Sequence, residues 1–230
     1  MEMHGYDTYD CGARGMYPAL MRFTTPDPLA EKYYSISSYA YCSNNPVKYI
    51  DPDGRLVKFA PKVSQDFKDK FTATVKYMNS KGTNGFLKSL NDSKEVYYIN
   101  ETTGNQNKFQ SKDKTILWNP NLAKLTDENA ILSPATLLNH ELDHANQFDS
   151  KKDEFVKNAT IEDKQYDNLE EKRVIEGSEQ ETAKKHGEIS NGEVTRKNHR
   201  MKGYIKVSDP TSTGEAVVTA PKKKEDQLNP

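Results

Sequence analysis

Two histidines and a glutamate lie close together in the stretch His-Glu-Leu-Asp-His, residues 140–144. In a helix, residues four apart lie one above the other on the same face, so His140 and His144 could reach one metal ion. Zn²⁺ accepts imidazole nitrogens at about 2.0–2.1 Å. Glu141 could take a proton from a water molecule that such a metal activates. This HExxH spacing therefore predicts a zinc site with Glu141 as the general base.

The residues around the motif predict the helix that this geometry needs. Ser133 followed by Pro134 is typical of a helix N-terminus, where a serine caps free amides and proline loses no hydrogen bond. Four apolar residues follow helical spacing beside the histidines, namely Leu137, Leu138, Ala145 and Phe148. The alternative is a surface helix with two solvated histidines.

A catalytic zinc site needs three protein ligands and an open position for water. The metzincin pattern requires a glycine at position 147 and a histidine at position 150, and Gln147 and Ser150 exclude it. A glutamate on a second helix, as in gluzincins, is the natural alternative. Residues 168–188 could form such a helix, with a break near Gly177 and a new capping box at Ser178. The candidate ligands in this stretch are Glu171, Glu170 and Glu179.

Further side chains downstream could assist the same site. Arg173 could orient a glutamate near the metal, or could form a surface salt bridge. Arg196, His199 and Tyr204 are donors that could stabilise a tetrahedral oxyanion. The spacing does not select one of these three.

The elements before the motif are predicted as two helices and three short strands. Apolar residues recur at spacings of three and four over residues 63–78, which predicts an amphipathic helix, and a short second helix is expected around residues 86–90. Residues 95–100, 107–110 and 115–118 are typical of strands, the first two forming a hairpin. Together with the motif helix, these elements predict an α+β domain with a small β-sheet.

Charge and hydropathy exclude several classes of protein. The 33 basic residues nearly balance the 34 acidic ones, which argues against nucleic acid as a partner. No apolar stretch approaches the roughly 18–20 residues of a membrane-spanning helix, so membrane insertion is not expected. The N-terminal residues lack the features of a signal peptide. The expected location is therefore cytoplasmic, or outside the cell by a leaderless secretion route.

Residues 1–55 are rich in Tyr, Pro, Asp and Asn and predict an irregular, mostly extended segment. The runs MRFTTPDPLAEKYY and SYAYCSNNPVKYIDPDG resemble the core-associated region that closes RHS/YD-repeat proteins. In that family, the final DPxG element marks the boundary with a variable C-terminal toxin cargo. The resemblance implies an RHS-core remnant over residues 1–55 and a cargo domain over residues 56–207. Residues 208–230 are predicted to be a flexible tail.

The cargo itself carries a second resemblance. HELDHANQ together with EEKRVIEGSEQETAK is similar to the zincin-like metallopeptidase domains that end some RHS proteins. This resemblance implies zinc held by His140, His144 and Glu171, with Glu141 as the catalytic base for peptide hydrolysis. It also implies a polymorphic-toxin effector whose partners are a protein or peptide substrate and an immunity protein. The alternative from another class is a non-catalytic remnant that binds a metal or a partner.

Overall fold

The computed structural model describes residues 9–10, 14–26, 37–41, 49–50 and 57–214 of the 230-residue chain. Residues 51–54, which carry the DPDG element, lie outside the described residues, as do both cysteines and residues 215–230. What the sequence predicts for these residues therefore stays a prediction. In the described part of the chain, no helix is long and apolar enough to cross a membrane.

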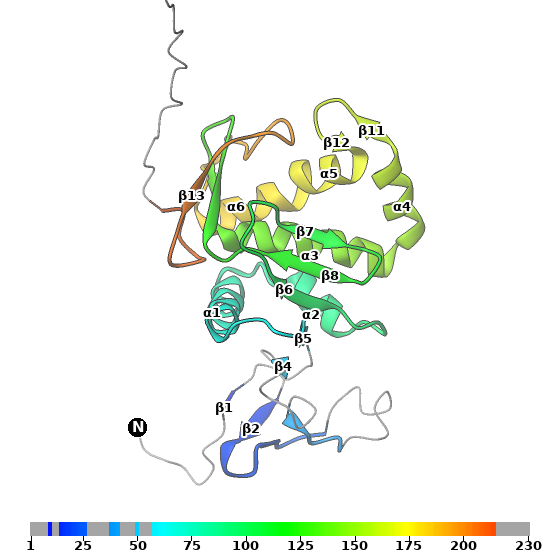
Figure 1. The fold of residues 1–230 in the computed structure, drawn as a ribbon, viewed down its shortest axis with the longest axis vertical. Helices are drawn as coiled ribbons and strands as arrows, with labels where there is room; N and C mark the ends of the chain where they lie inside the picture. The colour runs from blue at the N-terminus through cyan, green and yellow to red at the C-terminus, as the bar shows by residue number, and fades with distance from the viewer. Residues whose placement is uncertain (1–8, 11–13, 27–36, 42–48, 51–56, 215–230) are drawn as a thin grey trace, which may run out of the picture.

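A five-stranded sheet forms one layer of the molecule (Figure 1). Its strand order is β4-β5-β6-β8-β7, with β4 at Tyr49–Ile50, β5 at Val57–Phe59, β6 at Tyr98–Glu101, β7 at Lys108–Gln110 and β8 at Thr115–Trp118. Strands β5, β6 and β8 run parallel to one another, whereas β4 pairs antiparallel with β5 and β7 pairs antiparallel with β8. The edge strand β7 faces the motif helix. This arrangement is compatible with the predicted α+β class.

Two helices between β5 and β6 cover the sheet. Helix α1 spans Gln65–Lys81, with the Ser64 hydroxyl accepting from the Phe67 amide, and α2 spans Gly85–Asn91. The rings of Phe67 and Phe71 pack edge-on against both Phe59 and Trp118. These fully buried aromatics form the centre of the core. The predictions of an amphipathic helix and a short second helix are confirmed.

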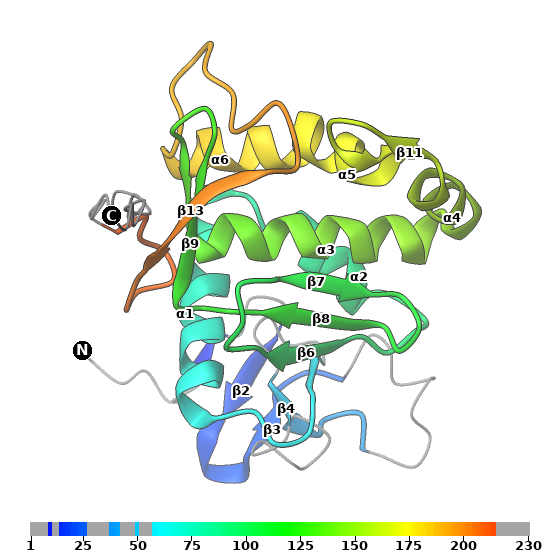
Figure 2. The same cartoon turned by 45° about the horizontal axis from the view of Figure 1, so that its top comes forward.

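The motif helix α3 spans Pro134–Ser150 and lies between the sheet and a second helical layer (Figure 2). The Ser133 hydroxyl accepts from the Thr136 amide, as the predicted N-cap requires. The carboxylate of Glu188 accepts from the hydroxyls of Ser133 and Thr136, which attaches the start of α3 to the segment after the second helical layer. Leu138 and Leu142 are fully buried against the sheet. The other face of α3 is also buried, although it carries the polar residues of the motif.

The second helical layer is one nearly continuous helix. Its parts are α5 at Leu169–Val174, a π-helical turn at Ile175–Glu179 and α6 at Gln180–His186. The predicted break near Gly177 and the capping box at Ser178 are therefore wrong. Ser178 lies inside the π-turn and donates a hydrogen bond to Asp143 of α3 instead. The Ser178 side chain thus bonds to another helix instead of capping the start of its own.

Helix α4 at Lys152–Thr160 and a small hairpin connect α3 to α5. The hairpin consists of β11 at Glu162–Asp163 and β12 at Asp167–Asn168. A three-stranded antiparallel sheet lies beside the N-terminal half of α3, in the order β10-β9-β13. Its strands are β9 at Leu122–Thr126, β10 at Ile131–Leu132 and β13 at Met201–Lys206. The two sheets and the second helical layer pack against the motif helix, and the hairpin contacts α4 and α5.

Two further sequence predictions need correction. The predicted hairpin between the strands at 95–100 and 107–110 is wrong, because β7 pairs with β8 and β6 lies on the other side of β8. The predicted tail at 208–230 begins too early. Pro210 is buried and its carbonyl accepts from the Ala135 amide at 2.9 Å, so the chain contacts the start of α3 beyond residue 207.

The described part of the N-terminal segment is a small antiparallel sheet of β1 at Tyr9–Asp10, β2 at Gly15–Tyr17 and β3 at Arg22–Phe23, with a 3₁₀ turn at Pro18–Leu20. The Arg14 guanidinium lies 3.6 Å from the centre of the Phe23 ring, and Tyr41 packs on the same ring. Strand β4 of this segment pairs with β5 across the predicted boundary at residue 55. That boundary stays a prediction.

Candidate metal centre

Three potential metal ligands converge where α3 meets α5. His140 and His144 lie one turn apart on α3, and both are almost fully buried. Their Nε2 atoms are 3.1 Å apart. Glu171, in the first turn of α5, places Oε2 3.2 Å from His140 Nε2 and Oε1 3.4 Å from His144 Nε2. Among the described residues, this group of ligand atoms, all within 4.8 Å of one another, could hold a metal ion.

The separations within this cluster fit a tetrahedral ion. Ligand atoms at about 2.1 Å from zinc, at tetrahedral angles, lie roughly 3.4 Å from each other. The two Nε2 atoms are 3.1 Å apart, and the two oxygens of Glu171 lie 3.2 Å from His140 Nε2 and 3.4 Å from His144 Nε2, one oxygen on each histidine. Two imidazoles and one carboxylate are also the donor set of a catalytic zinc site with one open position. The residues present therefore suit zinc.

The two other glutamate candidates lie behind the histidines rather than beside Glu171. His144 Nδ1 lies 3.1 Å from Glu170 Oε1, and His140 Nδ1 lies 2.9 Å from Glu179 Oε2. A carboxylate on Nδ1 fixes the orientation of the ring and leaves Nε2 to face the metal position. The structure thus separates the three glutamates by place, with Glu171 in the cluster and the other two orienting its histidines.

Each of these two orienting carboxylates is bound by an arginine. Arg173 donates to Glu170 at 2.7 Å and reaches Asp143 on α3 at 3.0 Å. Arg196 donates to Glu179 through Nε at 2.9 Å. Both glutamates are buried, so an arginine is needed to balance the negative charge. Arg173 therefore contacts a glutamate behind a histidine and not the candidate ligand Glu171.

The carboxylates change the proton affinity of the histidines. Burial lowers the pKa of His144, but hydrogen bonds to Glu170 and Glu171 outweigh it and raise the pKa to about 10. The pKa of His140 is also raised, because Glu171 and Glu179 outweigh its burial. Burial raises the pKa of Glu171, yet the two imidazoles hold it well below its usual range. Without a metal the cluster thus favours protonated rings between carboxylates, and a metal ion would replace those protons.

Glu141 lies on the same helix and points toward the edge strand β7. Its Oε2 accepts a hydrogen bond from the Phe109 main-chain amide at 2.7 Å. The Phe109 ring is buried against Phe148 and Phe155, so the strand that holds Glu141 is itself fixed to α3 and α4. The base candidate is therefore oriented by the backbone of a sheet edge.

The cluster and Glu141 lie in a cleft of about 660 Å³. The cleft is lined by residues 105–111, which include β7, and by the strands β9 and β13. Helices α3 and α4, the start of α5 and the segment before β13 complete the lining. Its lining includes Asn105, Asn107, Lys108, Lys124, Leu137, Phe155, Asn168, Met201 and Tyr204. A volume of this size suits a short stretch of peptide.

The three oxyanion candidates have different surroundings. Arg196 is buried, and its donors are directed to Glu179 and to the His199 carbonyl. His199 places Nε2 3.5 Å from Glu171 Oε2, while its Nδ1 lies 2.5 Å from Asp167. Tyr204 lines the cleft from β13 and is exposed. The geometry favours His199 over Arg196 as a donor beside the cluster.

Sequence reasoning missed Phe109 and Lys124. No side-chain pattern could identify Phe109, because its main-chain amide makes the contact with Glu141. Lys124 offered one weak signal, a single lysine within the otherwise mostly apolar strand LAKLT. Its place in the cleft follows from the pairing of β9 with β13.

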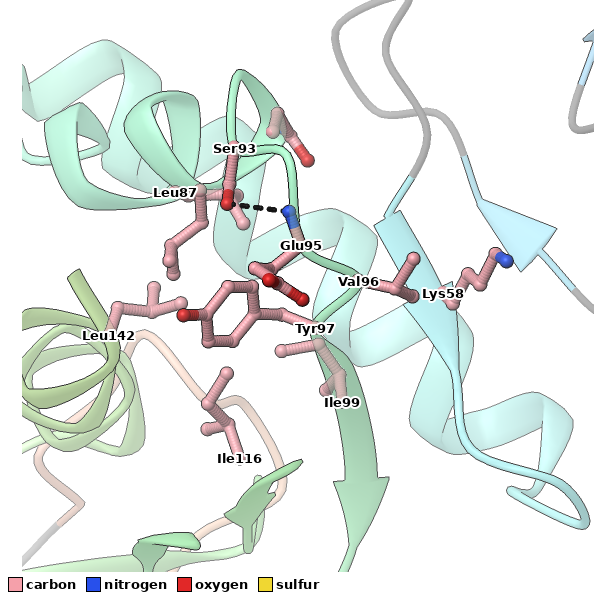
Figure 3. Close-up of a pocket in the computed structure, with 11 residues that line it drawn as sticks. Lys58, Leu87, Ser93, Glu95, Val96, Tyr97, Ile99, Ile116 and Leu142 are labelled. Carbon is pink, nitrogen blue, oxygen red and sulfur yellow. Dashed lines mark hydrogen bonds between the residues drawn. The ribbon is translucent and has the colours of Figure 1, made fainter. Parts of the chain in front are cut away.

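A second pocket lies away from the cluster, between α2, β6 and α3 (Figure 3). It holds only about 20 Å³, and its lining combines apolar residues such as Leu87 and Leu142 with polar ones such as Ser93. The Tyr97 hydroxyl donates to Asp149 at 3.1 Å beside it. This pocket has room for about one water molecule, not for a substrate.

Comparison with known families decides the class of this domain. The model of the Peptidase M91 family, described as effector protein, matches residues 57–200, which is more than half of the chain. The chain belongs to this family. The match contains the whole His-His-Glu cluster, Glu141 and the carboxylates behind the histidines. Residues 57–200 are thus an M91 peptidase-type effector domain.

Searches of curated proteins and of solved structures found no match to the chain. The site residues of this M91 domain therefore come from its own sequence and geometry. The assignment of Glu171 as third ligand and the presence of zinc remain predictions at this point.

Proposed function

We propose that the chain is a zinc-dependent metallopeptidase of the HExxH type that hydrolyses peptide bonds. The observation that supports this most strongly is the place of the His140, His144 and Glu171 cluster, with Glu141 beside it, in a cleft large enough for a peptide. Membership of a peptidase effector family supports the same reaction class.

The reaction needs a base and a proton carrier. A zinc ion at the cluster would supply the Lewis acidity that polarises the peptide carbonyl and acidifies water. Glu141 takes one proton from the attacking water as its oxygen bonds to the carbonyl carbon, and the C=O electron pair moves onto the carbonyl oxygen. Glu141 then gives that proton to the amide nitrogen as the C–N bond breaks. The Phe109 amide holds the carboxylate in place for both transfers.

The carbonyl oxygen that gains negative charge needs a donor. His199 supports this role, because Asp167 contacts Nδ1 and Nε2 lies on the side of Glu171. A carboxylate that orients an imidazole in this way limits the reorganisation needed when charge develops. His199 is therefore our preferred oxyanion donor, with Tyr204 as the second candidate on the cleft wall.

The resemblance of about residues 6–55 to the end of RHS proteins supports a biological setting. In this setting the M91 domain is a toxin cargo that cuts a protein in a rival or host cell. A leaderless secretion route would deliver it, and an immunity protein would protect the producing cell. Each of these statements is part of the proposal.

Metal content and turnover of the full chain test the proposal. Wild-type protein and His144→Ala are analysed for zinc, and about one zinc per wild-type chain, lost in the variant, is expected. Glu141→Gln should keep the zinc and lose cleavage of unfolded protein and peptide libraries. Glu154→Gln, an exposed glutamate on α4, is the matched control and should cleave like the wild type.

Three outcomes would contradict the proposal in different ways. Equal cleavage by Glu141→Gln would rule out the proposed base. Zinc absent from the wild type after reloading would rule out the metal site. Zinc without turnover on any library would favour the other class, a domain that binds metal or a partner without catalysis.

A further inference from the structure

Lys124 places a cationic side chain on the wall of the cleft. It lies at the centre of the β10-β9-β13 sheet, where Leu132 is its register partner on one side and Tyr204 on the other. Residues directly opposite each other in antiparallel strands project to the same face. Leu132 is fully buried, Lys124 is half-buried and Tyr204 is exposed, so this row leads from the core out into the cleft.

Within the described part of the chain, the Lys124 ammonium forms no ion pair. Among the described residues, no carboxylate lies within ion-pair distance of its Nζ, whereas Glu170 and Glu179 each have an arginine. Burial lowers the pKa of Lys124, and the negative charge of Glu141, the strongest of the carboxylates around it, opposes that effect. A half-buried charge without a partner is costly, which makes it suited to a ligand that brings the missing charge.

Strand β7 adds a second positive charge to the cleft. Lys108 on the edge strand β7 lines the same cleft, is exposed and forms no ion pair within the described part of the chain. The carboxylates that line the cleft are engaged by histidines, by Arg173 and by the Phe109 amide. The free charges offered to a substrate on these two walls are therefore ammonium groups.

We propose that Lys124, assisted by the Tyr204 hydroxyl, binds an anionic group of the substrate, so that the peptidase selects peptides with a carboxylate close to the scissile bond. This inference rests on the proposed function, because it assigns the substrate class of the same cleft. The carboxylate could belong to an Asp or Glu side chain or to the chain terminus. Lys124 is near Glu141 in the cleft, so the anion would lie within a few residues of the cleaved bond.

Cleavage profiling tests this inference with the full, zinc-loaded chain. A synthetic peptide library with blocked termini is digested, and the cut positions are identified by mass spectrometry. Wild-type protein should enrich Asp and Glu at one position near the cut. Lys124→Met should lose this enrichment, and Lys124→Glu should replace it with Lys and Arg. Lys206→Met, which removes a lysine of the same sheet outside the cleft lining, should match the wild type.

One acidic peptide and its glutamine analogue measure the size of the effect. The wild type should favour the acidic peptide by about 10- to 100-fold in kcat/KM, as expected for one charge-assisted hydrogen bond. Lys124→Met should bring this ratio close to one. A parallel library with free C-termini distinguishes the sources, since a preference found only there identifies the terminal carboxylate.

A binding experiment separates failure of this inference from failure of the peptidase proposal. Glu141→Gln is immobilised and used to capture peptides from the same libraries. Acidic peptides retained by this variant, but not by Glu141→Gln combined with Lys124→Glu, would support the anion site even without turnover by the wild type. Acidic enrichment that persists in both Lys124 variants, or is absent from wild-type cleavage and from capture, would overturn the inference.

Discussion

The main-chain amide of Phe109 donates a hydrogen bond to the Glu141 carboxylate at 2.7 Å, joining the edge of the five-stranded sheet to the motif helix. In an antiparallel strand, the N–H and C=O of one residue point to the same side. Since the Phe109 amide points to α3, it takes no part in the pairing with β8. The edge strand therefore has a spare donor, and Glu141 uses it.

Phe109→Pro is expected to weaken catalysis without removing a ladder hydrogen bond. Proline lacks the amide and is tolerated at an edge whose N–H points away from the sheet. Loss of a hydrogen bond to a charged group should lower kcat/KM by about 10- to 100-fold. Phe109→Leu keeps the amide and is the control for the lost ring. Unchanged kcat/KM in the proline variant, with a native circular dichroism spectrum, would show that this contact does not position the base.

Glu179→Gln is expected to weaken zinc binding although Glu179 lies outside the ligand cluster. The substitution leaves His140 with a weaker partner on Nδ1 and leaves Arg196 without its buried counter-charge. Loss of such an orienting group typically reduces metal affinity by about 10- to 100-fold. Competition with a chromogenic zinc chelator measures this change. Glu176→Gln, an exposed glutamate of the same π-turn, should bind zinc like the wild type.

Zinc affinity should rise with pH across the neutral range. In the metal-free cluster the pKa of His144 is raised to about 10, so this ring carries a proton at neutral pH that zinc must displace. Each displaced proton makes the apparent affinity rise by about tenfold per pH unit below that pKa. Zinc titrations at several pH values between 6 and 8 measure the slope. An affinity that is flat over this range would contradict protonated histidines in the free site.

Leu142→Ala should destabilise the domain through the core rather than through the metal. Leu142 occupies a variable position of the motif, is fully buried and packs in the cluster with Trp118. Truncation of a buried leucine typically costs about 2–5 kcal/mol. Urea unfolding of the metal-free protein measures this loss. Val156→Ala, at an exposed position of α4, should change the free energy of unfolding by much less.

Several features of this protein follow from local sequence. The serine-proline cap, the apolar spacing and the i, i+4 histidines specify a helix that presents two ligands on one face. The predictions for α1, α2 and the strands β6, β7 and β8 are likewise confirmed in kind, since side-chain periodicity depends on neighbours along the chain. The family match then agrees with the class of reaction inferred from the motif.

The pairing of strands required the tertiary structure. Residues 98–101 and 108–110 have strand-like side chains, but nothing local indicates whether they pair with each other or with a third strand. The structure places β8 between them, so β7 becomes the edge beside α3. The contact of Phe109 with Glu141 and the place of Lys124 in the cleft both depend on such long-range pairing.

The separation of the three glutamates also required the tertiary structure. In a regular helix with 3.6 residues per turn, Glu179 would point roughly 180° away from Glu170. The π-turn at Ile175–Glu179 takes up an extra residue and rotates Glu179 back toward His140. Sequence alone predicted the two histidines, the candidate base Glu141 and a set of candidate glutamates, because these predictions depend on spacing within single helices. Only the packing of α5 and the π-turn against α3 decided that Glu171 faces the cluster while Glu170 and Glu179 lie behind the histidines, because helix phase is set by long-range contacts.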